Sequence, residues 1–393
     1  MQTRPCWVEI RTRSFEDNYR FLAGLADPHA ELLAVVKADA YGHGLALCAP
    51  AAVRAGARWL GVTSVEEGVA ARAVCPAARV LVIGGVFPGQ GVDVVRHQLT
   101  PVVWDPLQFD ELESAARSIG ARSLSVHLEI DTGMSRQGVD LDGMTKILQR
   151  FNRDSPLRLE GVTTHLFAAD EADGHVTDNQ LGRTSEVLDQ VRAAGVYPGL
   201  LNVGNTAALL AGQAPVIGAL AAHHQMKALM RPGLALYGIT PQYDPQFEPD
   251  QPLTLLEARR SLRPVLTWKS QVTSVRSIPI GAVVGYNGTF VATEPMRLAL
   301  IAVGYADGLD RRLGNRFTLL VRGQKGPLVG RVSMDQSVID VTDIPDVCAG
   351  DEVVILGQQG SELITAFDHA EATETIPWEV FTRIGSRVRR IEV

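Results

Sequence analysis

The stretch LLAVVKADAYGHG, residues 32–44, decides the fold because it joins a short apolar run to a polar turn that begins with a lysine. The run Leu32–Val36 is typical of a buried strand. An open doubly wound α/β sheet usually follows its first strand with a G-x-G-x-x-G turn. The turn at 37–44 lacks that spacing. The stretch therefore favours a closed barrel over a dinucleotide-binding sheet.

Further β-rich apolar runs recur along the first two-thirds of the chain. They are Trp59–Val62, Val80–Ile83, Leu99–Val103, Ser125–Ile130, Leu159–Thr164, Leu200–Val203 and Ala228–Met230. Between them lie helix-like segments such as SVEEGVAARAV (64–74) and DNQLGRTSEVLDQVRAAG (178–195). Strands that alternate with helices imply βα units and a parallel sheet. We therefore predict an α/β fold with an N-terminal (β/α)8 TIM-type barrel over residues 12–258.

The last third of the chain has a different pattern. The segment 239–264 is rich in Pro, Asp and Gln, which predicts a loop or linker. Residues 259–393 then alternate short strands with turns, and Asn287-Gly288 is a strong hairpin signal. We predict a mainly β domain here, joined by an N-terminal strand within 1–11 and carrying a short helical piece near Glu371–Ile384. The stretches 212–224 and 242–256 are interpreted as surface insertions.

The bulk composition narrows the class of protein. Of 393 residues, 46% are hydrophobic and 21% charged, as in soluble globular proteins. Charged residues interrupt the N-terminal stretch where a secretory signal would be apolar, and the four cysteines form no C-x-x-C pair. We expect a cytoplasmic protein without a metal site. The net charge of −7, with no basic run, predicts neither a nucleic-acid nor a membrane partner.

The barrel architecture itself selects candidate site residues. Catalytic groups of such barrels come from the C-terminal ends of strands, and phosphate often binds at the loops after strands 7 and 8. By this rule the candidates are Lys37, Asp131, Arg136, His165, Asn205, Thr206, Arg231 and Gly233.

Lys37 is the most informative candidate, because the chain has only five lysines among its 37 basic residues. At a dry strand end, desolvation lowers the pKa of the amine and makes it nucleophilic toward an aldehyde. The Thr206 hydroxyl and the backbone of Gly233 can hold an anion on the phosphate side. This layout is expected for a pyridoxal phosphate carrier, and a snorkelling lysine is the plainer alternative.

Two further residues have a functional and a structural interpretation. A guanidinium at Arg231 would leave the pyridine nitrogen of the cofactor unprotonated, which favours proton transfer over chemistry that needs a strong electron sink. An arginine packed at a barrel mouth is the alternative. His165, taken alone, is predicted to be a core histidine with satisfied hydrogen bonds.

Eight segments, in order along nearly the whole chain, resemble the alanine racemase family, which has the pyridoxal-phosphate fold called type III. They are KADAYGHG (37–44), HLEIDTGMSRQG (127–138), GVTTHLFAADEAD (161–173), GNTAAL (204–209), RPGLALYG (231–238), VGYNGTF (284–290), VGYADGLDRRL (303–313) and GRVSMDQSVIDVT (330–342). The first and last of these segments are the most specific.

The resemblance implies interconversion of L-alanine and D-alanine by two bases on opposite faces of pyridoxal phosphate. Lys37 would hold the cofactor as an internal aldimine and act on one face, and Tyr286 from a partner subunit would act on the other. The active form would then be a homodimer with shared active sites. The implied role is D-alanine biosynthesis for peptidoglycan precursors, with D-alanine degradation left open.

The resemblance also assigns roles to the remaining site residues. Those implied in cofactor binding are Lys37, Tyr41, His165, Asn205, Thr206, Arg231, Gly233 and Leu234. Arg136 and Met334 would hold the substrate carboxylate. Glu129, Tyr305 and Asp335 would support the site, with Tyr305 at an entrance channel that also contains Asp307 and Arg311. His165 would link the cofactor ring to the catalytic tyrosine.

The chain departs from the family pattern at two positions. Glu129 stands where many relatives carry a lysine modified to a carbamate, so the negative charge beside Arg136 is expected without carbon dioxide chemistry. Ser386 stands where a tyrosine is common, and a smaller side chain could admit a larger substrate. A broad-specificity or serine-type racemase therefore remains the main alternative. A fold-related amino-acid decarboxylase and a non-catalytic pyridoxal phosphate carrier are less consistent with the motifs.

Overall fold

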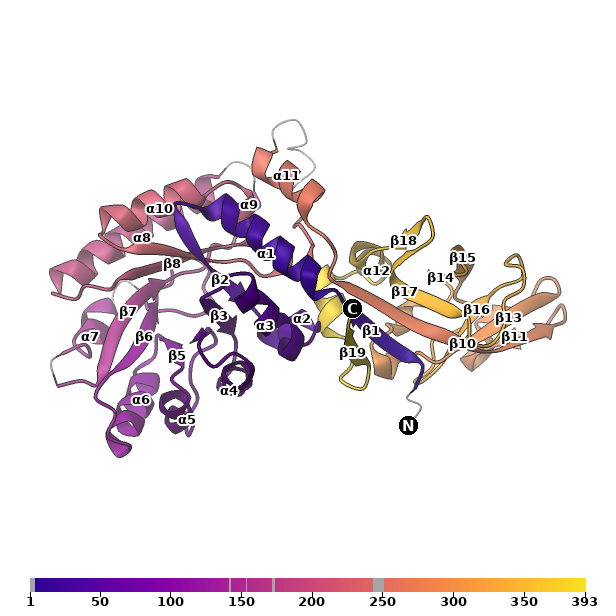
Figure 1. Ribbon diagram of the computed structural model, residues 1–393, viewed down its shortest axis with the longest axis horizontal. Coiled ribbons are helices and arrows are strands. Elements are labelled where there is room, and N and C mark those ends of the chain that lie inside the picture. The colour runs from indigo at the N-terminus through magenta and orange to yellow at the C-terminus, as the bar shows by residue number, and fades with distance from the viewer. Residues whose placement is uncertain (1–3, 141–142, 153, 172–173, 243–250) are drawn as a thin grey trace. The chain divides into compact units, whose positions relative to one another are not determined.

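The chain folds into two compact units (Figure 1). The computed structural model describes residues 4–140, 143–152, 154–171, 174–242 and 251–393. The barrel unit comprises Arg13–Ala40 and Leu45–Pro264. The β unit comprises the residues up to Thr12, the short segment Tyr41–Gly44 and Val265–Val393.

The core of the barrel unit is a closed barrel of eight parallel strands, as predicted. The strands are β2 (Ala30–Val35), β3 (Trp59–Val62), β4 (Arg79–Val82), β5 (Thr100–Val103), β6 (Leu124–Glu129), β7 (Leu157–Thr163), β8 (Leu200–Asn205) and β9 (Lys227–Arg231). Each predicted apolar run corresponds to one of them, with ends that differ by a few residues. Because β9 pairs in parallel with β2, the barrel closes and all strand C-termini meet at one mouth.

Helices follow most of the strands and cover the outside of the barrel (Figure 1). They are α1 (Thr12–Ala26), α3 (Leu45–Arg54), α4 (Val65–Val74), α5 (Gly91–Arg96), α6 (Pro106–Ser118), α7 (Met144–Leu148), α8 (His175–Ala193), α9 (Thr206–Leu210), α10 (Ala214–His223) and α11 (Leu253–Ser261). Local sequence explains several of their starts. Helix α6, for example, begins with Pro106 behind an Asp105 cap, and its third residue, Gln108, completes a capping box.

Two sequence interpretations of this unit were wrong. The stretch 212–224, taken as an insertion, contains helix α10, whose Ile217 and Ala221 are buried against the barrel. The stretch 239–264, taken as a loop, contains helix α11 with Leu255 fully buried. Its polar composition hid an apolar face of only two buried positions, and residues 243–250 lie outside the described part of the chain.

The β unit is organised around β10 (Leu266–Ile278). This strand pairs antiparallel with β1 (Cys6–Ile10), β13 (Met296–Ile301) and β17 (Glu352–Gln359). The same sheet also contains β14 (Thr318–Val321), β15 (Gln324–Pro327), β16 (Ser337–Asp340), β18 (Glu362–Ile364) and β19 (Arg389–Glu392). The predicted helical piece consists of two short helices, α12 (Ala366–Ala372) and α13 (Pro377–Thr382).

The hairpin predicted from Asn287-Gly288 is present in the β unit. Strand β11 (Val283–Val284) pairs antiparallel with β12 (Phe290–Val291), and the connecting turn contains Tyr286. Asn287 and Gly288 both have positive φ, at 61° and 57°. Asparagine and glycine adopt this conformation more readily than other residues, which explains the turn.

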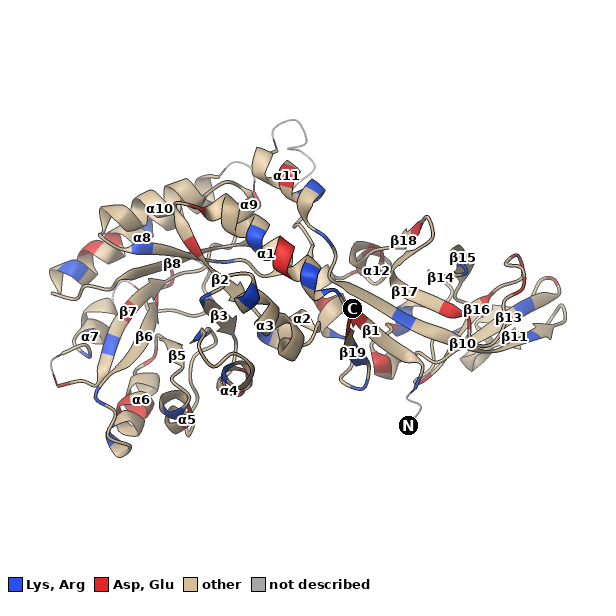
Figure 2. Cartoon of the chain, viewed as in Figure 1, with Lys and Arg blue, Asp and Glu red and all other residues tan. Residues whose placement is uncertain are grey.

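The charged residues are spread along both units, with both signs interspersed (Figure 2). No helix in the described part of the chain combines the length and the apolar character that crossing a membrane requires.

Candidate active site

Lys37 lies at the mouth of the barrel, two residues after the end of β2. Its side chain is partly buried. Burial lowers the pKa of the amine, and the positive charges of Arg136 and Arg231 lower it further. A lysine in this environment carries more of the neutral, nucleophilic form than a surface lysine does.

The backbone after Lys37 forms an unusual left-handed turn. Ala38, Asp39, Ala40 and Tyr41 all have φ between 51° and 54°, although none is glycine. Each such residue costs roughly 1–2 kcal/mol relative to a right-handed one. A hydrogen bond offsets part of this conformational cost, because Glu67 Oε1 accepts from the Ala38 amide at 2.6 Å. Strain of this kind concentrates at functional sites, and no sequence rule anticipates it here.

Arg231, the last residue of β9, is buried at the same mouth with 7% exposure. Its Nη1 donates to Thr163 Oγ1 at 3.0 Å and to the Asn202 carbonyl at 2.7 Å, and also to Asn202 Oδ1. Its Nη2 donates to the Thr164 carbonyl at 2.8 Å and to His165 Nδ1 at 3.2 Å. Burial lowers the pKa of Arg231 to about 10, so the guanidinium stays cationic at neutral pH.

These bonds leave one donor of Arg231 for a ligand. Both Nη groups already donate to barrel acceptors, whereas no described residue accepts a hydrogen bond from Nε. An arginine has five N–H donors in a rigid plane. The Nε–H is therefore the donor that the barrel leaves available.

His165 contacts Arg231 and is held neutral. Burial lowers the pKa of the imidazole to about 3, helped by the positive charges of Arg231, Arg136 and Lys37. Because Arg231 only donates, Nδ1 of His165 must be the unprotonated acceptor, and the proton lies on Nε2. His165 is half-buried rather than a core residue, and the prediction of a core histidine missed its bond to Arg231.

The loops after β8 and β9 meet at Thr206 and Gly233. Thr206 Oγ1 accepts from the Gly233 amide at 3.0 Å. The next residue, Leu234, begins the 3-10 helix η1 (Leu234–Tyr237) and is buried. The structure thus brings together three residues that the sequence placed on the phosphate side. Tyr41 belongs to the β unit, where burial raises the pKa of its phenol to about 12.

The Asn205 side chain forms hydrogen bonds with nearby backbone groups of the barrel unit. Its Oδ1 caps helix α9 by accepting from the Ala208 amide at 3.0 Å, and its Nδ2 donates to the Leu166 carbonyl at 3.1 Å. The preceding Gly204 has φ of 94°, and a Cβ there would lie 2.6 Å from Met230 Cε. Asn205 therefore ties the His165 loop to the loop that carries Thr206.

Glu129, at the end of β6, is buried with 5% exposure. Its Oε2 accepts from Gln137 Nε2 at 2.6 Å, a contact that sequence reasoning missed. Burial raises the pKa of the carboxyl, and the charges of Arg231 and Arg136 oppose that rise. Glu129 thus acts on exposed Arg136 through charge, because no hydrogen bond joins the two among the described residues.

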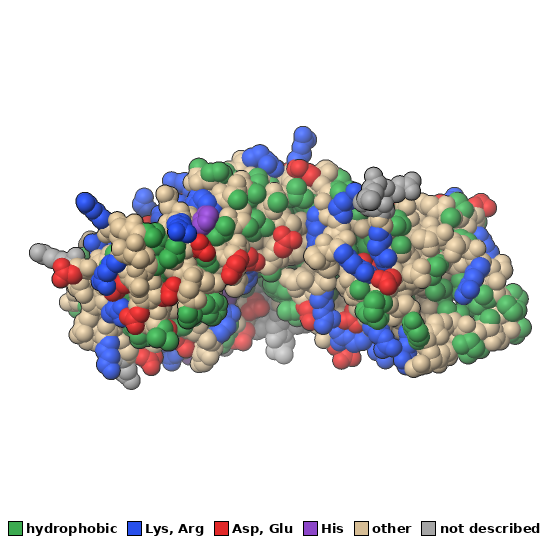
Figure 3. Space-filling view, turned by 90° about the horizontal axis from the view of Figure 1, so that it is seen from below, with side chains coloured by type: hydrophobic (Ala, Val, Ile, Leu, Met, Phe, Trp, Pro, Cys, Tyr) green, Lys and Arg blue, Asp and Glu red, His purple; other side chains and the backbone are tan. Residues whose placement is uncertain are grey.

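The other predicted site residues lie in the β unit. Tyr286, at the hairpin tip, is 67% exposed. Val283 and Val291 beside it are exposed as well. Figure 3 shows hydrophobic side chains gathered at the end of the β unit where β11 and β13 lie. An exposed apolar hairpin of this kind is typical of a surface that another protein covers.

Tyr305 and Met334 are held close together by backbone hydrogen bonds. The Tyr305 amide donates to the Ser333 carbonyl, and the Ala306 amide donates to the Met334 carbonyl, both at 3.0 Å. Tyr305 and Met334 keep their side chains exposed at 43% and 53%. The two loops that carry these side chains therefore form one rigid patch in the β unit.

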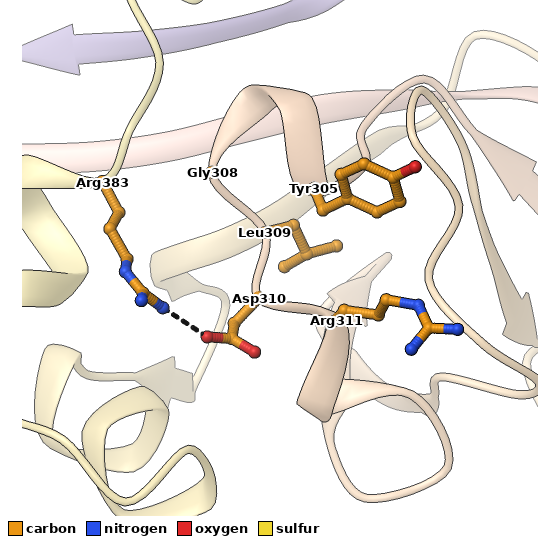
Figure 4. Close-up of a pocket in the computed structure, with 6 residues that line it drawn as sticks. All are labelled: Tyr305, Gly308, Leu309, Asp310, Arg311 and Arg383. Carbon is orange, nitrogen blue, oxygen red and sulfur yellow. Dashed lines mark hydrogen bonds and ion pairs between the residues drawn. The ribbon is translucent and has the colours of Figure 1, made fainter.

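A surface cavity of about 470 Å³ lies next to this patch. Its lining residues are Tyr305, Gly308, Leu309, Asp310, Arg311 and Arg383 (Figure 4). On one side Arg383 Nη1 donates to Asp310 Oδ2 at 2.6 Å. Figure 4 shows the Arg311 side chain extending away from that ion pair, on the same side as the Tyr305 ring. Arg311 therefore offers a cation to this cavity, as the expected channel would require.

Asp307 does not line the cavity, because it is fully buried in the β unit. Its Oδ2 accepts from Arg4 Nη2 at 3.0 Å and from the Gly304 amide at 2.9 Å. Its Oδ1 accepts from Arg387 Nε at 2.7 Å, and Arg387 Nη2 also donates to Asp335 Oδ1 at 2.8 Å. The expected channel position is corrected here, since the carboxylate instead fastens the loops of Tyr305 and Asp335.

Barrel and site together define a (β/α)8-barrel enzyme with a lysine of lowered pKa at the barrel mouth. The sequence matches the families "Alanine racemase, N-terminal domain" over residues 10–241 and "Alanine racemase, C-terminal domain" over 265–392. The chain therefore belongs to the alanine racemase family.

Individual relatives agree with this assignment along the full length. The chain is 36% identical over 393 residues to the alanine racemase of a Nostoc species, covering 100% of this chain and 96% of that protein. The alanine racemase structure from Streptomyces lavendulae matches with a TM-score of 0.87 and 32% identity, covering 100% and 98% of the two chains. The Bartonella henselae structure, described with covalently bound pyridoxal phosphate, matches with a TM-score of 0.78, 28% identity and 99% coverage of each chain.

The buried Asp307 carboxylate should be important for the stability of the β unit. Replacement by Asn leaves Arg4 without its carboxylate partner and Arg387 with Asp335 alone, so Asp307→Asn should lower the free energy of unfolding by about 3 kcal/mol. Urea denaturation followed by fluorescence measures this loss. Asp351→Asn, which removes the half-buried partner of the exposed Arg322, is the matched control and should cost under about 1 kcal/mol. Equal losses in the two variants would refute the proposed fastening of the loops.

Proposed function

We propose that the protein interconverts L-alanine and D-alanine by moving a proton between two bases, Lys37 and Tyr286, on opposite faces of pyridoxal phosphate. The observation that carries the proposal is the Lys37 amine of lowered pKa beside the fixed cation Arg231 at one barrel mouth. Membership of the alanine racemase family supports the same reaction.

The residues at the barrel mouth fit pyridoxal phosphate. Lys37 offers a nucleophilic amine to the aldehyde, and Arg231 offers its Nε–H to the pyridine nitrogen. We assign phosphate binding to Tyr41, Thr206 and the amides of Gly233 and Leu234, with Asn205 holding the loop beside them. When bound, pyridoxal phosphate stabilises the negative charge that develops at the α-carbon of an amino acid.

Arg231 sets the character of the site. A carboxylate at this position would draw a proton onto the pyridine nitrogen, whereas a guanidinium can only donate a hydrogen bond to it. An unprotonated pyridine ring withdraws electrons less strongly than a protonated one. Such a site favours rapid return of the proton to the α-carbon over slower side reactions.

Racemisation requires a proton to leave one face of the α-carbon and another to arrive on the opposite face. The Lys37 Nζ serves one face, and the Tyr286 phenol oxygen serves the other. His165 assists Tyr286, because its Nδ1 accepts from Arg231 and its Nε2–H can donate to a phenolate oxygen. Arg136 and Met334 hold the substrate carboxylate, and Tyr305 with Arg311 controls entry.

A homodimer explains the exposure of Tyr286. A catalytic base that is two-thirds exposed in its own chain cannot exclude water, and the hairpin around it is apolar. We infer that the hairpin inserts at the barrel mouth of a second copy in a two-fold dimer, so that each active site uses both chains. We place this dimer in the cytoplasm, supplying D-alanine for peptidoglycan precursors.

Ser386 favours a second candidate function, a broad-specificity or serine-type racemase. It is exposed, and it is small where many relatives carry tyrosine. Its hydroxymethyl group leaves room that a phenol would fill. Substrates slightly larger than alanine could use that room.

Exchange of the α-proton tests the function directly. Incubation of the purified protein with L-alanine in deuterated water should yield D-alanine and deuterium at the α-carbon, followed by NMR and chiral chromatography. L-serine, assayed in parallel, tests the broad-specificity alternative, and Ser386→Tyr should reduce any serine turnover more than alanine turnover. Absence of α-deuterium with every amino acid offered would refute the racemase proposal.

Mixed dimers test the shared active site. Lys37→Arg and Tyr286→Phe should each lose activity by roughly 10²–10⁴-fold, because each lacks one base. Refolded together in equal amounts, they should recover about a quarter of wild-type activity, since half the dimers are mixed and each mixed dimer has one intact site.

The control mixes Lys37→Arg with the double variant Lys37→Arg/Tyr286→Phe, which can form no intact site. Recovery in the control, or none in the test mixture, would show that Lys37 and Tyr286 do not meet across subunits.

Glu129 should make the enzyme independent of carbon dioxide. Because a carboxylate already stands beside Arg136, added bicarbonate should leave wild-type activity unchanged. Glu129→Lys should be weakly active and should gain activity with bicarbonate, because a carbamate would restore the negative charge. Steady-state kinetics with and without bicarbonate measure both effects, and a bicarbonate response in the wild-type protein contradicts the expectation.

A further inference from the structure

Two polar side chains to which the proposed function assigns no role lie inside the barrel, close to Arg231. They are His127 on β6 and Asn202 on β8, and both are 0% exposed. His127 contacts Asn202 and the ring of Trp59 on β3. Because β3 and β8 are not neighbours of β6, the imidazole lies in the barrel interior. A polar group in such a place is costly unless it is hydrogen bonded.

The amide of Asn202 has only one orientation that suits both neighbours. Its Oδ1 accepts from Arg231 Nη1, and its Nδ2 lies 3.5 Å from His127 Nδ1. A guanidinium can only donate, so the amide oxygen must face Arg231 and the amide NH2 must face His127. It follows that Nδ1 of His127 accepts and that its proton lies on Nε2.

The surroundings of His127 keep the ring neutral, as this arrangement requires. Burial lowers the pKa of His127 to about 3, and the positive charges of Arg79 and Arg231 lower it further. A carboxylate also faces the ring: Glu160 Oε2 lies 4.0 Å from Nε2 and is paired with Arg79. Among the described residues, none accepts a hydrogen bond from His127 Nε2.

The barrel provides space specifically for this ring. A Cβ at Gly161 on β7 would lie 2.7 Å from His127 Cε1, so only glycine leaves room for the imidazole there. On another side the ring packs edge-on against Trp59, with centroids 5.7 Å apart. The imidazole is thus confined where its Nδ1 meets Asn202.

We propose that His127 is a positioning residue: by accepting from Asn202 it keeps the amide oxygen of Asn202 on Arg231, and so fixes the guanidinium that binds the cofactor ring. The inference rests on the proposed function only in assigning Arg231 to the pyridine nitrogen. Without the acceptor on His127, the buried NH2 of Asn202 has no partner and must move to find one. That movement takes an acceptor away from Arg231.

Two substitutions of His127 separate hydrogen bonding from packing. His127→Phe keeps a ring against Trp59 but removes the acceptor, whereas His127→Asn keeps an acceptor at the Nδ1 position but leaves a void. We expect His127→Phe to weaken pyridoxal phosphate binding about tenfold and to shift the visible absorption of the bound cofactor. His127→Asn should be less stable to heat and yet keep wild-type affinity and absorption.

His369→Phe is the matched control, since His369 is also a buried histidine but lies in the β unit, where its Nε2 donates to the Ile355 carbonyl at 2.8 Å. It should lower thermal stability and leave cofactor affinity and absorption unchanged. Wild-type affinity in His127→Phe, or equally weak binding in His127→Asn, would overturn the proposal.

The tautomer of His127 supplies a readout that does not depend on turnover. Nitrogen-15 NMR of the histidine-labelled holoenzyme, with the His127 signal identified by its loss in His127→Phe, should show an unprotonated Nδ1 and a protonated Nε2. A proton on Nδ1 would overturn the proposal. Failure of the wild-type protein to exchange α-protons would instead refute the racemase function and leave this result intact.

Discussion

The burial of the Arg231 guanidinium is the constraint on which the rest of the barrel mouth depends. A cation with 7% exposure must have its donors satisfied, because an unpaired buried charge costs several kcal/mol. The fold supplies acceptors from β7 and β8 and from the loop at His165. These bonds orient the plane of the guanidinium, leave Nε–H without an acceptor among the described residues and fix the tautomer of His165.

The same cation shapes the chemistry of its neighbours. Its charge contributes to the lowered pKa of Lys37 and of His165, so the amine becomes nucleophilic and the imidazole stays neutral. In the β unit, the buried carboxylate of Asp307 forms ion pairs with Arg4 and Arg387 and so holds the loops of Tyr305 and Met334 in place. In each unit, a buried ion with several hydrogen-bond partners thus holds loops together, Arg231 in the barrel and Asp307 in the β unit.

Much of the fold could be predicted because local patterns report it well. The barrel strands are short apolar runs between amphipathic helices, and the Asn287-Gly288 hairpin follows from the preference of these residues for positive φ. Helices α10 and α11 were missed. Helix α10 is apolar on nearly all sides and α11 lies in polar sequence, so neither shows a clear helical periodicity, and tertiary packing stabilises both.

The sequence by itself determined the architecture, the family and the candidates Lys37, Arg231 and Tyr286, because motif spacing and strand ends are properties of the linear chain. Only the tertiary structure decided which groups these residues contact. Three features illustrate this. The backbone after Lys37 forms a strained left-handed turn, and Glu129 accepts a hydrogen bond from Gln137. In addition, Asn202 contacts both Arg231 and His127, which are far from it in sequence. Hydrogen bonds and charge effects act over a few ångströms in space, and sequence distance does not report those distances.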